Sequence, residues 1–359
     1  MVHLSDEILE KVLCRLPVKL LLRFRCVSKS WLALISSPYF VKLHLKLSVQ
    51  TKRNINLNLY RHNDISLKFL NYELRSSFSC DGLLCMSNVN NALDNVFLWN
   101  PSIRKSIKLP YESTDHSIHL GFPSTCVYQI GYDNINDDYK VVRTVVFLKT
   151  GDIIDYEVKV YSLRSNSWHK LEKFSHCPDW NSFGNSIIGG ALHWISTGNS
   201  YLNRESLIVS FDLATEKSRV LPQPEYRNPY YKLYVDKLGG CLLLSCHYES
   251  STIVDIFLLK EYGGKNEHWS KWITLSPPTP SFRIDYPLQP ITYSNNGKKV
   301  LFAMGYNRHV WYNLEEKSFE KMSVYCVDKL FTLYTCLESL VSLPIFDLPT
   351  AITEIGGVA

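Results

Sequence analysis

The chain has 359 residues, of which 45% are hydrophobic, 20% charged and 13% aromatic, and its formal net charge is +5. This composition indicates a globular protein with two domains or one small and one large unit, and it excludes a low-complexity chain. The first residues lack the basic start and apolar core of a secretory signal, and no apolar run approaches the roughly 20 residues of a membrane span. We therefore expect a cytoplasmic and/or nuclear protein without disulfides and without a membrane partner.

The charge is concentrated at the N-terminal end. The first 53 residues hold ten Lys and Arg against three acidic residues, a net charge of +7, which leaves −2 on the rest of the chain. A basic segment can bind nucleic acid or an acidic protein. Here the basic residues are interleaved with Leu, Phe and Val and form no continuous charged face, which favours a protein partner over nucleic acid.

The stretch from residue 4 to residue 47 predicts a set of short helices. Ser5 is a suitable N-cap, Pro17 ends the first helix and opens the second, Ser28 caps a third, and Pro38 marks another break. The apolar face of the first helix recurs at helical spacing and comprises Ile8, Leu9, Val12, Leu13 and Leu16.

This helical stretch carries more apolar surface than it can bury alone. A module of about 45 residues is marginal by itself because small domains bury too little surface. Leu20, Leu21 and Leu22 are consecutive, so their side chains point about 100° apart and cannot all face one core. Part of this apolar surface should remain exposed, and such a patch marks an interaction site.

The same residues resemble an F-box. The resemblance lies in Leu4, in Glu7-Ile8-Leu9 with Ser5 replacing the usual proline, in Leu16-Pro17-Val18-Lys19, and in Arg25-Cys26-Val27-Ser28-Lys29-Ser30-Trp31. F-box modules bind the Skp adaptor of cullin-based ubiquitin ligases, and the adaptor is acidic, which fits the basic segment. The resemblance implies that the adaptor interface or its immediate support comprises Leu4, Ile8, Leu9, Leu13, Leu16, Pro17, Val18, Leu21, Val27 and Trp31.

Beyond about residue 69 the pattern changes to short strands. Five segments share a strand, a polar turn and a returning strand, at residues 96–110, 158–168, 208–222, 255–272 and 310–319. Further apolar strands precede most of them, so each unit has about four strands, the size of a propeller blade. Strand-like pieces at residues 55–60 and 330–343 are left over. We expect these two ends to pair as a sixth blade and close the ring.

The strand region resembles the plant F-box-associated domain, a kelch-like propeller, and the whole layout is shared by S-locus F-box proteins. The matching pieces are residues 80–84, 99–102, 130–133, 138–143, 166–168, 190–194, 210–213, 260–263 and 338–343. The chain is thus interpreted as an α+β multidomain protein. Its predicted parts are a helical F-box at residues 1–47, an all-β propeller, six-bladed, at residues 48–345, and a tail at residues 346–359.

The resemblance implies a non-catalytic substrate receptor of an SCF-type ubiquitin ligase. Its target would be a protein bound by long connectors on one propeller face, since functional residues gather on loops held by rigid scaffolds. The longest connectors span residues 111–125, 175–185, 223–231 and 277–287. Their aromatic residues are the predicted target-binding residues, because Tyr and Trp are favoured at interface hot spots: Tyr111, Trp180, Tyr226, Tyr230, Tyr231 and Tyr286.

No motif of the chain predicts catalysis, a metal or a cofactor. The sequence contains no GxSxG, Walker loop, GxGxxG or HExxH. Asp133, Asp137 and Asp138 are interpreted as a surface turn, His116 and His119 as a solvated loop, and His193 as a hydrogen-bonded structural histidine. Three alternatives stay open: a receptor for pistil ribonucleases in self-incompatibility, a propeller enzyme such as an oxidase or glycosidase, and a nucleic-acid binder.

Overall fold

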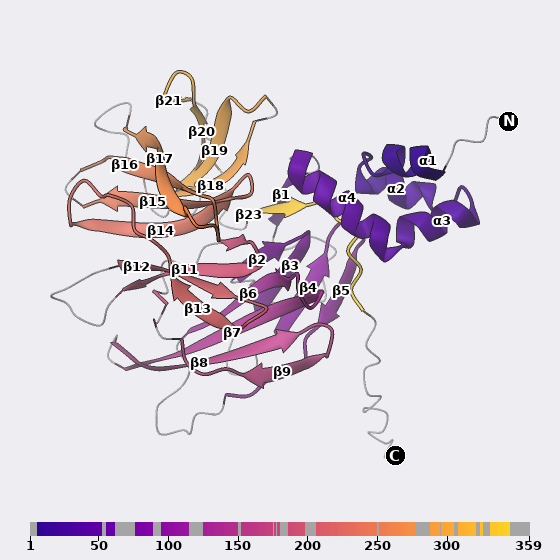
Figure 1. Cartoon of the computed structure of the whole chain (residues 1–359), viewed down its shortest axis with the longest axis horizontal. Helices are drawn as coiled ribbons and strands as arrows, with labels where there is room; N and C mark the ends of the chain where they lie inside the picture. Colours follow the sequence, from indigo (N-terminus) through magenta and orange to yellow (C-terminus); the bar gives the residue numbers. More distant parts are fainter. Residues whose placement is uncertain are drawn as a thin grey trace, which may run out of the picture.

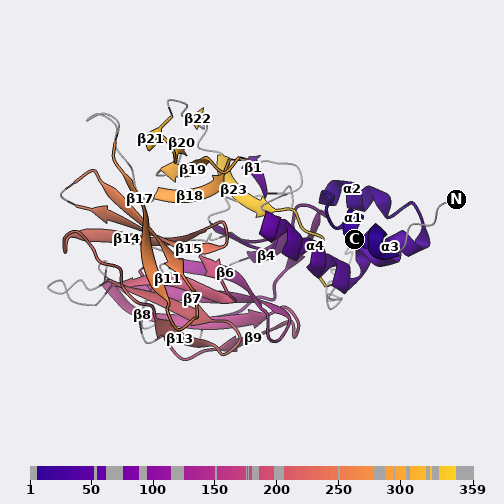
Figure 2. The ribbon, with the colours of Figure 1, turned by 45° about the horizontal axis from the view of Figure 1, so that its top comes forward.

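In the described part of the computed structural model, the chain forms four helices and a β-propeller (Figure 1). The helices stand to one side of the propeller, next to the strands β1, β4 and β23, in both views (Figures 1 and 2). The structure describes residues 6–51, 55–61, 76–88, 95–114, 125–149, 152–174, 176, 178–179, 186–197, 206–249, 251–277, 288–294, 296–304, 308–320, 324–325 and 331–344.

The helices form the helical module, which we define as residues 6–51. They are α1 (Asp6–Leu13), α2 (Val18–Phe24), α3 (Lys29–Ser36) and α4 (Pro38–Thr51). Pro17 occupies the N-cap of α2, and the Ser28 hydroxyl accepts a hydrogen bond of 3.1 Å from the backbone N–H of Trp31 at the start of α3. The predicted helix breaks at Pro17 and Ser28 are therefore confirmed, whereas Ser5 lies outside the described residues.

Five antiparallel sheets follow, and we name them blades A to E in chain order. Blade A is β2 (Ser76–Cys80), β3 (Leu83–Asn88), β4 (Asn95–Asn100) and β5 (Lys105–Lys108); blade B is β6 (Thr125–Asp133), β7 (Asp138–Lys149), β8 (Asp152–Ser162) and β9 (Ser167–Lys170); blade C is β10 (Ile187–Ile188), β11 (Ala191–Thr197), β12 (Ser206–Asp212) and β13 (Lys217–Val220); blade D is β14 (Tyr231–Leu238), β15 (Cys241–Tyr248), β16 (Val254–Lys260) and β17 (His268–Leu275); blade E is β18 (Leu288–Tyr293), β19 (Lys299–Met304), β20 (Arg308–Asn313), β21 (Ser318–Phe319) and β22 (Val324–Tyr325). The five predicted hairpins are confirmed as the third and fourth strands of these blades.

Local turn chemistry explains why the hairpins were visible in the sequence. In blade C, Asp212 Oδ1 accepts hydrogen bonds from the backbone N–H groups of Ala214 at 3.1 Å and Thr215 at 2.7 Å. Asn313 Oδ1 makes the same kind of turn in blade E. The last turn residue of blade C, Glu216, has a φ of 55°, the left-handed conformation that reverses the chain into β13. Asp and Asn side chains favour such turns because they bond to the backbone two or three residues on.

The two ends of the propeller pair with each other. β1 (Ile55–Arg61) lies antiparallel to β23 (Phe331–Leu337), with Ile55 opposite Leu337 and Arg61 opposite Phe331. The predicted pairing of the chain ends is confirmed, but the prediction of six full blades is wrong. Among the described residues there are five blades and this two-stranded ribbon. Residues 338–343, which the prediction assigned to the sixth blade, leave the sheet and run between blade A and the helical module.

The hydrophobic core lies between the faces of neighbouring blades. One cluster joins blades A and B around Leu98, Ile130 and Tyr161, and a second joins blades B and C around Trp194. Further clusters join blade C to D and blade D to E. The ring is therefore held by sheet-on-sheet packing, as alternating inward residues of each strand require.

Strand direction divides the propeller into two faces. The turns between first and second strands and between third and fourth strands emerge on one face, which we call the turn face. The links from each fourth strand to the next blade leave on the opposite side, the connector face, and their described residues are 109–114, 171–174, 176, 178–179, 186, 221–230 and 276–277. The helical module contacts the turn face, because Lys42 Nζ lies 2.7 Å from Asp137 Oδ2 in the β6–β7 turn and Ile103 of the β4–β5 turn packs against the module.

Candidate functional site

The helical module has a small core of its own. Its buried apolar side chains include Leu13, Val18, Leu21, Ile35 and Phe40. The rings of Phe24 and Trp31 meet edge to face at 5.6 Å and join α2 to α3. Leu20 and Leu22 are only partly buried while Leu21 is fully enclosed, which is the division that three consecutive leucines on a helix require.

Four aliphatic side chains of α1, α3 and the link between α2 and α3 remain about half exposed. They are Ile8 at 49%, Val12 at 53%, Val27 at 57% and Leu32 at 46%. Ile8 and Val12 lie four residues apart on α1 and so share one face of that helix. Exposed branched aliphatic side chains on rigid helices provide the apolar area that protein interfaces bury at their centre.

Nine of the ten predicted adaptor-binding residues fall into three groups by exposure. Leu4 lies outside the described residues. Three are exposed, namely Ile8, Pro17 and Val27; three are half-buried, namely Leu9, Leu16 and Trp31; and three are buried in the module core, namely Leu13, Val18 and Leu21. The three buried side chains pack in the module core beneath the exposed ones. Val12 and Leu32 were not among the predicted residues, although the helical spacing from Ile8 pointed to Val12.

Basic residues outnumber acidic ones on the exposed surface from α1 to α2, where Glu7 is an exposed acidic residue. Lys11, Arg15, Lys19 and Arg23 all lie in exposed positions, four residues apart in turn. Glu10 is partly buried, and its Oε1 accepts a hydrogen bond from the Tyr39 hydroxyl at 3.2 Å. The apolar side chains are thus flanked by positive charge, which favours a partner with acidic residues around an apolar contact.

The predicted target-binding residues lie on the connector face wherever the structure describes them. Tyr111 and Tyr230 are well exposed. The Tyr226 and Tyr231 rings are 4.2 Å apart, and the Tyr226 hydroxyl donates a 2.7 Å hydrogen bond to Gln223 Oε1. The structure thus brings Tyr226, Tyr230 and Tyr231 together at one connector. Trp180 and Tyr286 lie outside the described residues.

An ion pair that the sequence did not reveal anchors this connector. Arg227 reaches the buried carboxylate of Asp255 through Nε at 2.5 Å and Nη2 at 3.0 Å, and the Tyr248 hydroxyl adds a bond of 3.1 Å. Burial alone would raise the pKa of Asp255, but hydrogen bonds from Arg227, Thr274, Lys271 and Tyr248 outweigh it and hold this pKa well below its usual range. The connector is therefore a preorganised surface, which lowers the entropy cost of binding.

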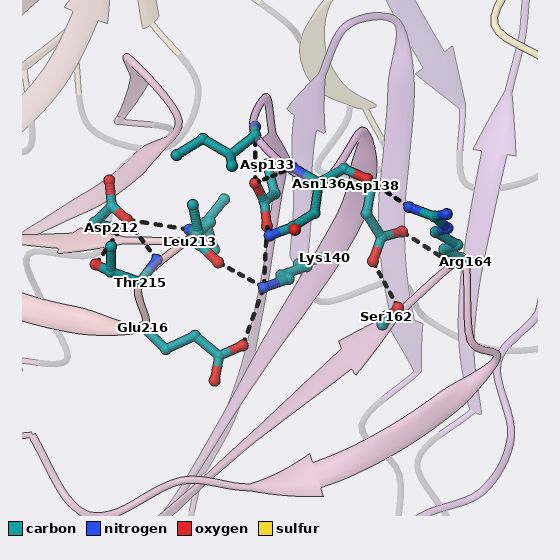
Figure 3. A network of polar contacts seen from close by, with 12 residues as sticks. Asp133, Asn136, Asp138, Lys140, Ser162, Arg164, Asp212, Leu213, Thr215 and Glu216 are labelled. Atoms are coloured by element: carbon teal, nitrogen blue, oxygen red, sulfur yellow. Dashed lines mark hydrogen bonds and ion pairs between the residues drawn. The ribbon is translucent and has the colours of Figure 1, made fainter.

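The acidic stretch at residues 131–140 is structural. Figure 3 shows Asp133 closing the β6–β7 turn, where its Oδ1 accepts the backbone N–H groups of Ile135 and Asn136, both at 3.0 Å. The predicted surface turn is thus confirmed. Lys140 crosses from blade B to blade C, with Nζ 2.6 Å from the Leu213 carbonyl oxygen and 3.0 Å from Glu216 Oε1 (Figure 3). These contacts join two blades.

His193 is also structural, as predicted. Its Nδ1–H donates to the Ser186 carbonyl at 2.7 Å, so its Nε2 accepts the Tyr262 hydroxyl at 2.9 Å. Burial lowers the pKa of His193 to about 4, which keeps the ring neutral. His116 and His119 lie outside the described residues.

Neither a metal-ion cluster nor a membrane-spanning helix occurs in the described part of the chain. No group of three or more His, Cys, Asp or Glu side chains there is placed to hold a metal ion. None of the helices described has the length and apolar composition that a membrane span needs.

Comparison with known proteins links both parts of the chain to one family. The F-box domain profile matches residues 1–43, and the F-box associated beta propeller domain profile matches residues 32–343. Three relatives from Arabidopsis thaliana are similar: F-box protein CPR1, 30% identical over 95% of this chain and 89% of the relative; F-box protein At4g22390, 27% identical over 95% and 90%; and F-box/kelch-repeat protein At3g23880, 28% identical over 76% and 79%. With a helical module that matches the F-box and a propeller that matches the associated domain, the chain belongs to the family of plant F-box proteins with an F-box-associated β-propeller.

Proposed function

We propose that the protein is the substrate receptor of an SCF-type cullin ubiquitin ligase. The helical module docks on a Skp-family adaptor, and the connector face of the propeller holds a target protein for ubiquitination and proteasomal degradation. The observation that carries the proposal is the set of half-exposed apolar side chains on the module, Ile8, Val12, Val27 and Leu32.

Physical chemistry supports an adaptor at this surface. Burying a Val, Leu or Ile side chain fully contributes about 1.5–3 kcal/mol, so four half-exposed ones offer a useful share of a protein interface. The exposed basic residues Lys11, Arg15, Lys19 and Arg23 complement an acidic adaptor and would speed its association.

The propeller's role in this proposal is to position the target. The connector face points away from the turn face that holds the module, so a bound target would extend away from the adaptor-docking surface. Tethering raises the local concentration of the target near the ubiquitin-charged enzyme to about the mM range. No residue of this chain needs to act as a catalyst in such a mechanism.

Co-purification of the full chain with a Skp adaptor tests the proposal. Wild-type protein should bind the adaptor, and Val12→Asp should weaken binding at least about 30-fold, the loss typical of a hot-spot residue. The matched control is Val220→Asp, which changes a similarly exposed valine on β13 of blade C and should bind like wild type. If wild-type protein fails to bind the adaptor, or if both variants bind equally well, the proposed docking surface is wrong.

A further inference from the structure

A short segment near the C-terminal end joins the two parts of the molecule. We call residues Glu338–Leu343 the strap. It follows β23 directly and passes between blade A and the helical module. Glu338 Oε2 accepts a hydrogen bond of 3.2 Å from the backbone N–H of Val18, a residue 320 positions earlier in the chain. The last part of the propeller therefore contacts the first part of the protein.

The Glu338 carboxylate acts as a cap for α2. The N-cap residue of α2 is Pro17, which makes no side-chain hydrogen bond to the helix, and the first turn of α2 contains no acidic residue. A helix that begins this way leaves N–H groups that need an acceptor, and a negative charge there stabilises the helix through its dipole. Glu338 supplies both the acceptor and the charge.

Leu340 of the strap completes the core of the module. It is only 2% exposed and belongs to the same hydrophobic cluster as Leu13, Leu21, Ile35 and Phe40. A core this small depends on each large side chain, because few others share the burial. One core residue of the module therefore comes from the C-terminal part of the chain.

The other side of the strap is fixed to blade A. Asn100 Nδ2 donates hydrogen bonds to the carbonyl oxygens of Ser339 at 3.0 Å and Val341 at 2.8 Å. The Ser102 hydroxyl accepts the backbone N–H of Ser339 at 3.1 Å. A Cβ at Gly82 would lie 2.3 Å from the Ser339 Cβ, so this close approach requires a glycine. The strap therefore has one defined position on the blade.

The place of the strap in the chain links it to ring closure. Its first residue follows β23, and β23 takes its position by pairing with β1. The β1–β23 pair therefore places Glu338 and Leu340 beside the module. Displacing the strap would leave α2 without this cap and the module core with a gap.

We propose that the strap makes adaptor docking conditional on a closed propeller, an inference that rests on the proposed function. When the strap is in place, the helices are held in the arrangement that presents Ile8 and Val12. When it is displaced, that arrangement is populated less often, and the apparent affinity for the adaptor falls by the same fraction. A chain whose propeller has not closed would thus be kept from the ligase.

Hydrogen exchange of the full-length protein without adaptor tests the structural half of this proposal. Leu340→Ala should speed exchange of the α1–α3 amides by about 30-fold or more, the equivalent of losing a buried leucine side chain from a core. The control is Leu275→Ala, which removes an equally buried leucine from the cluster between blades D and E. It should speed exchange there and leave α1–α3 as in wild type.

Adaptor binding of the same proteins tests the functional half. Leu340→Ala should raise the dissociation constant for the adaptor about tenfold, whereas Leu275→Ala should leave it unchanged. Unchanged α1–α3 exchange in Leu340→Ala would overturn the proposal, and so would faster exchange with unchanged adaptor affinity. If wild-type protein does not bind the adaptor, the proposed function itself fails, and the exchange data still decide whether the strap supports the module.

Glu338→Gln provides a milder variant that retains the side-chain length. Losing the negative charge at the α2 N-terminus should speed exchange of the first α2 amides about two- to fivefold, as expected for a charge–dipole contribution. Exchange rates equal to wild type at these amides would show that Glu338 is not a cap and would also contradict the proposal.

Discussion

The indole N–H of Trp269 on β17 donates a 2.8 Å hydrogen bond to the carbonyl oxygen of Pro222, the second residue of the connector between blades C and D. Trp168 on β9 makes the same bond to Pro110 at 2.9 Å, at the start of the connector between blades A and B. In both cases the fourth strand of one blade holds the connector that leaves the preceding blade. Tyr111 directly follows Pro110, and Tyr226 and Tyr230 lie further along the connector that contains Pro222.

Replacing these tryptophans by phenylalanine should therefore loosen the connector face. Trp269→Phe removes the N–H but keeps an aromatic ring, and we expect the free energy of unfolding to fall by about 1 kcal/mol in urea titrations. Trp272→Phe on the same strand is the matched control, because its ring packs against Tyr293, and it should cost less. Trp168→Phe and Trp269→Phe act on different blades, so their effects should add within about 0.5 kcal/mol. Strong non-additivity would contradict independent anchors.

The Arg227–Asp255 pair should contribute to stability more than a surface pair does. Arg227→Ala removes two hydrogen bonds to a buried carboxylate that keeps Lys271, Thr274 and Tyr248 as partners. Because Arg227 is itself about half exposed, we expect a loss of about 1–2 kcal/mol. Lys298→Ala, which breaks an exposed pair with Glu315, should cost less than about 0.5 kcal/mol. Equal losses in urea titrations would show that the buried carboxylate confers no advantage.

Tyr230 should affect target capture without affecting stability. It is 68% exposed, so Tyr230→Ala removes little packing from the fold. Proximity labelling in cells, with adaptor docking disabled by Val12→Asp so that targets accumulate, should lose part of its labelled set when Tyr230→Ala is added. Tyr39→Ala, an exposed tyrosine on the helical module, is the control and should leave the set unchanged. An identical labelled set for both variants would remove Tyr230 from the target surface.

Asp236 should make stability depend on pH in an unusual direction. It is buried on β14, accepts the backbone N–H of Lys237 at 2.7 Å, and burial raises its pKa to about 7. A carboxyl with a raised folded-state pKa contributes stability that is fully present below the unfolded pKa near 4 and is lost as pH rises to about 7. Asp236→Asn resembles the protonated form, so it should unfold at higher urea concentration than wild type at pH 7.5, by a smaller margin at pH 5, and at a similar concentration only below about pH 4. Parallel pH profiles for the two proteins would contradict a buried, titrating Asp236.

Much of the fold could be read from local features of the sequence. Asp212 and Asn313 mark third-to-fourth strand turns because each side chain bonds to its own turn, and this signal needs no tertiary information. The pairing of the chain ends was also predictable, because two strand-like pieces remained after the five four-stranded units had been assigned. The prediction of a sixth blade was wrong because residues 338–343 look like a strand but leave the sheet and pack between blade A and the module.

The site was harder to predict because exposure is decided by distant residues. Ile8 and Leu13 belong to the same apolar stripe of α1, yet Ile8 is exposed and Leu13 is buried. The buried side of that stripe packs in the cluster that contains Leu340. The first 50 residues carry no pattern that predicts contact with a residue so far along the chain. Arg227 and Asp255 escaped prediction for the same reason, since 28 residues separate them.

The division between a turn face and a connector face has an evolutionary consequence. Lengthening a loop adds little entropy cost, about 0.6 kcal/mol for each doubling, so insertions and substitutions in the connectors are tolerated. Such changes fall on the side of the ring opposite Lys42, Ile103 and the strap, and they leave the attachment of the helices intact. Gene duplicates of such a chain can therefore diverge at the connector face while inheriting an unchanged attachment of the helical module.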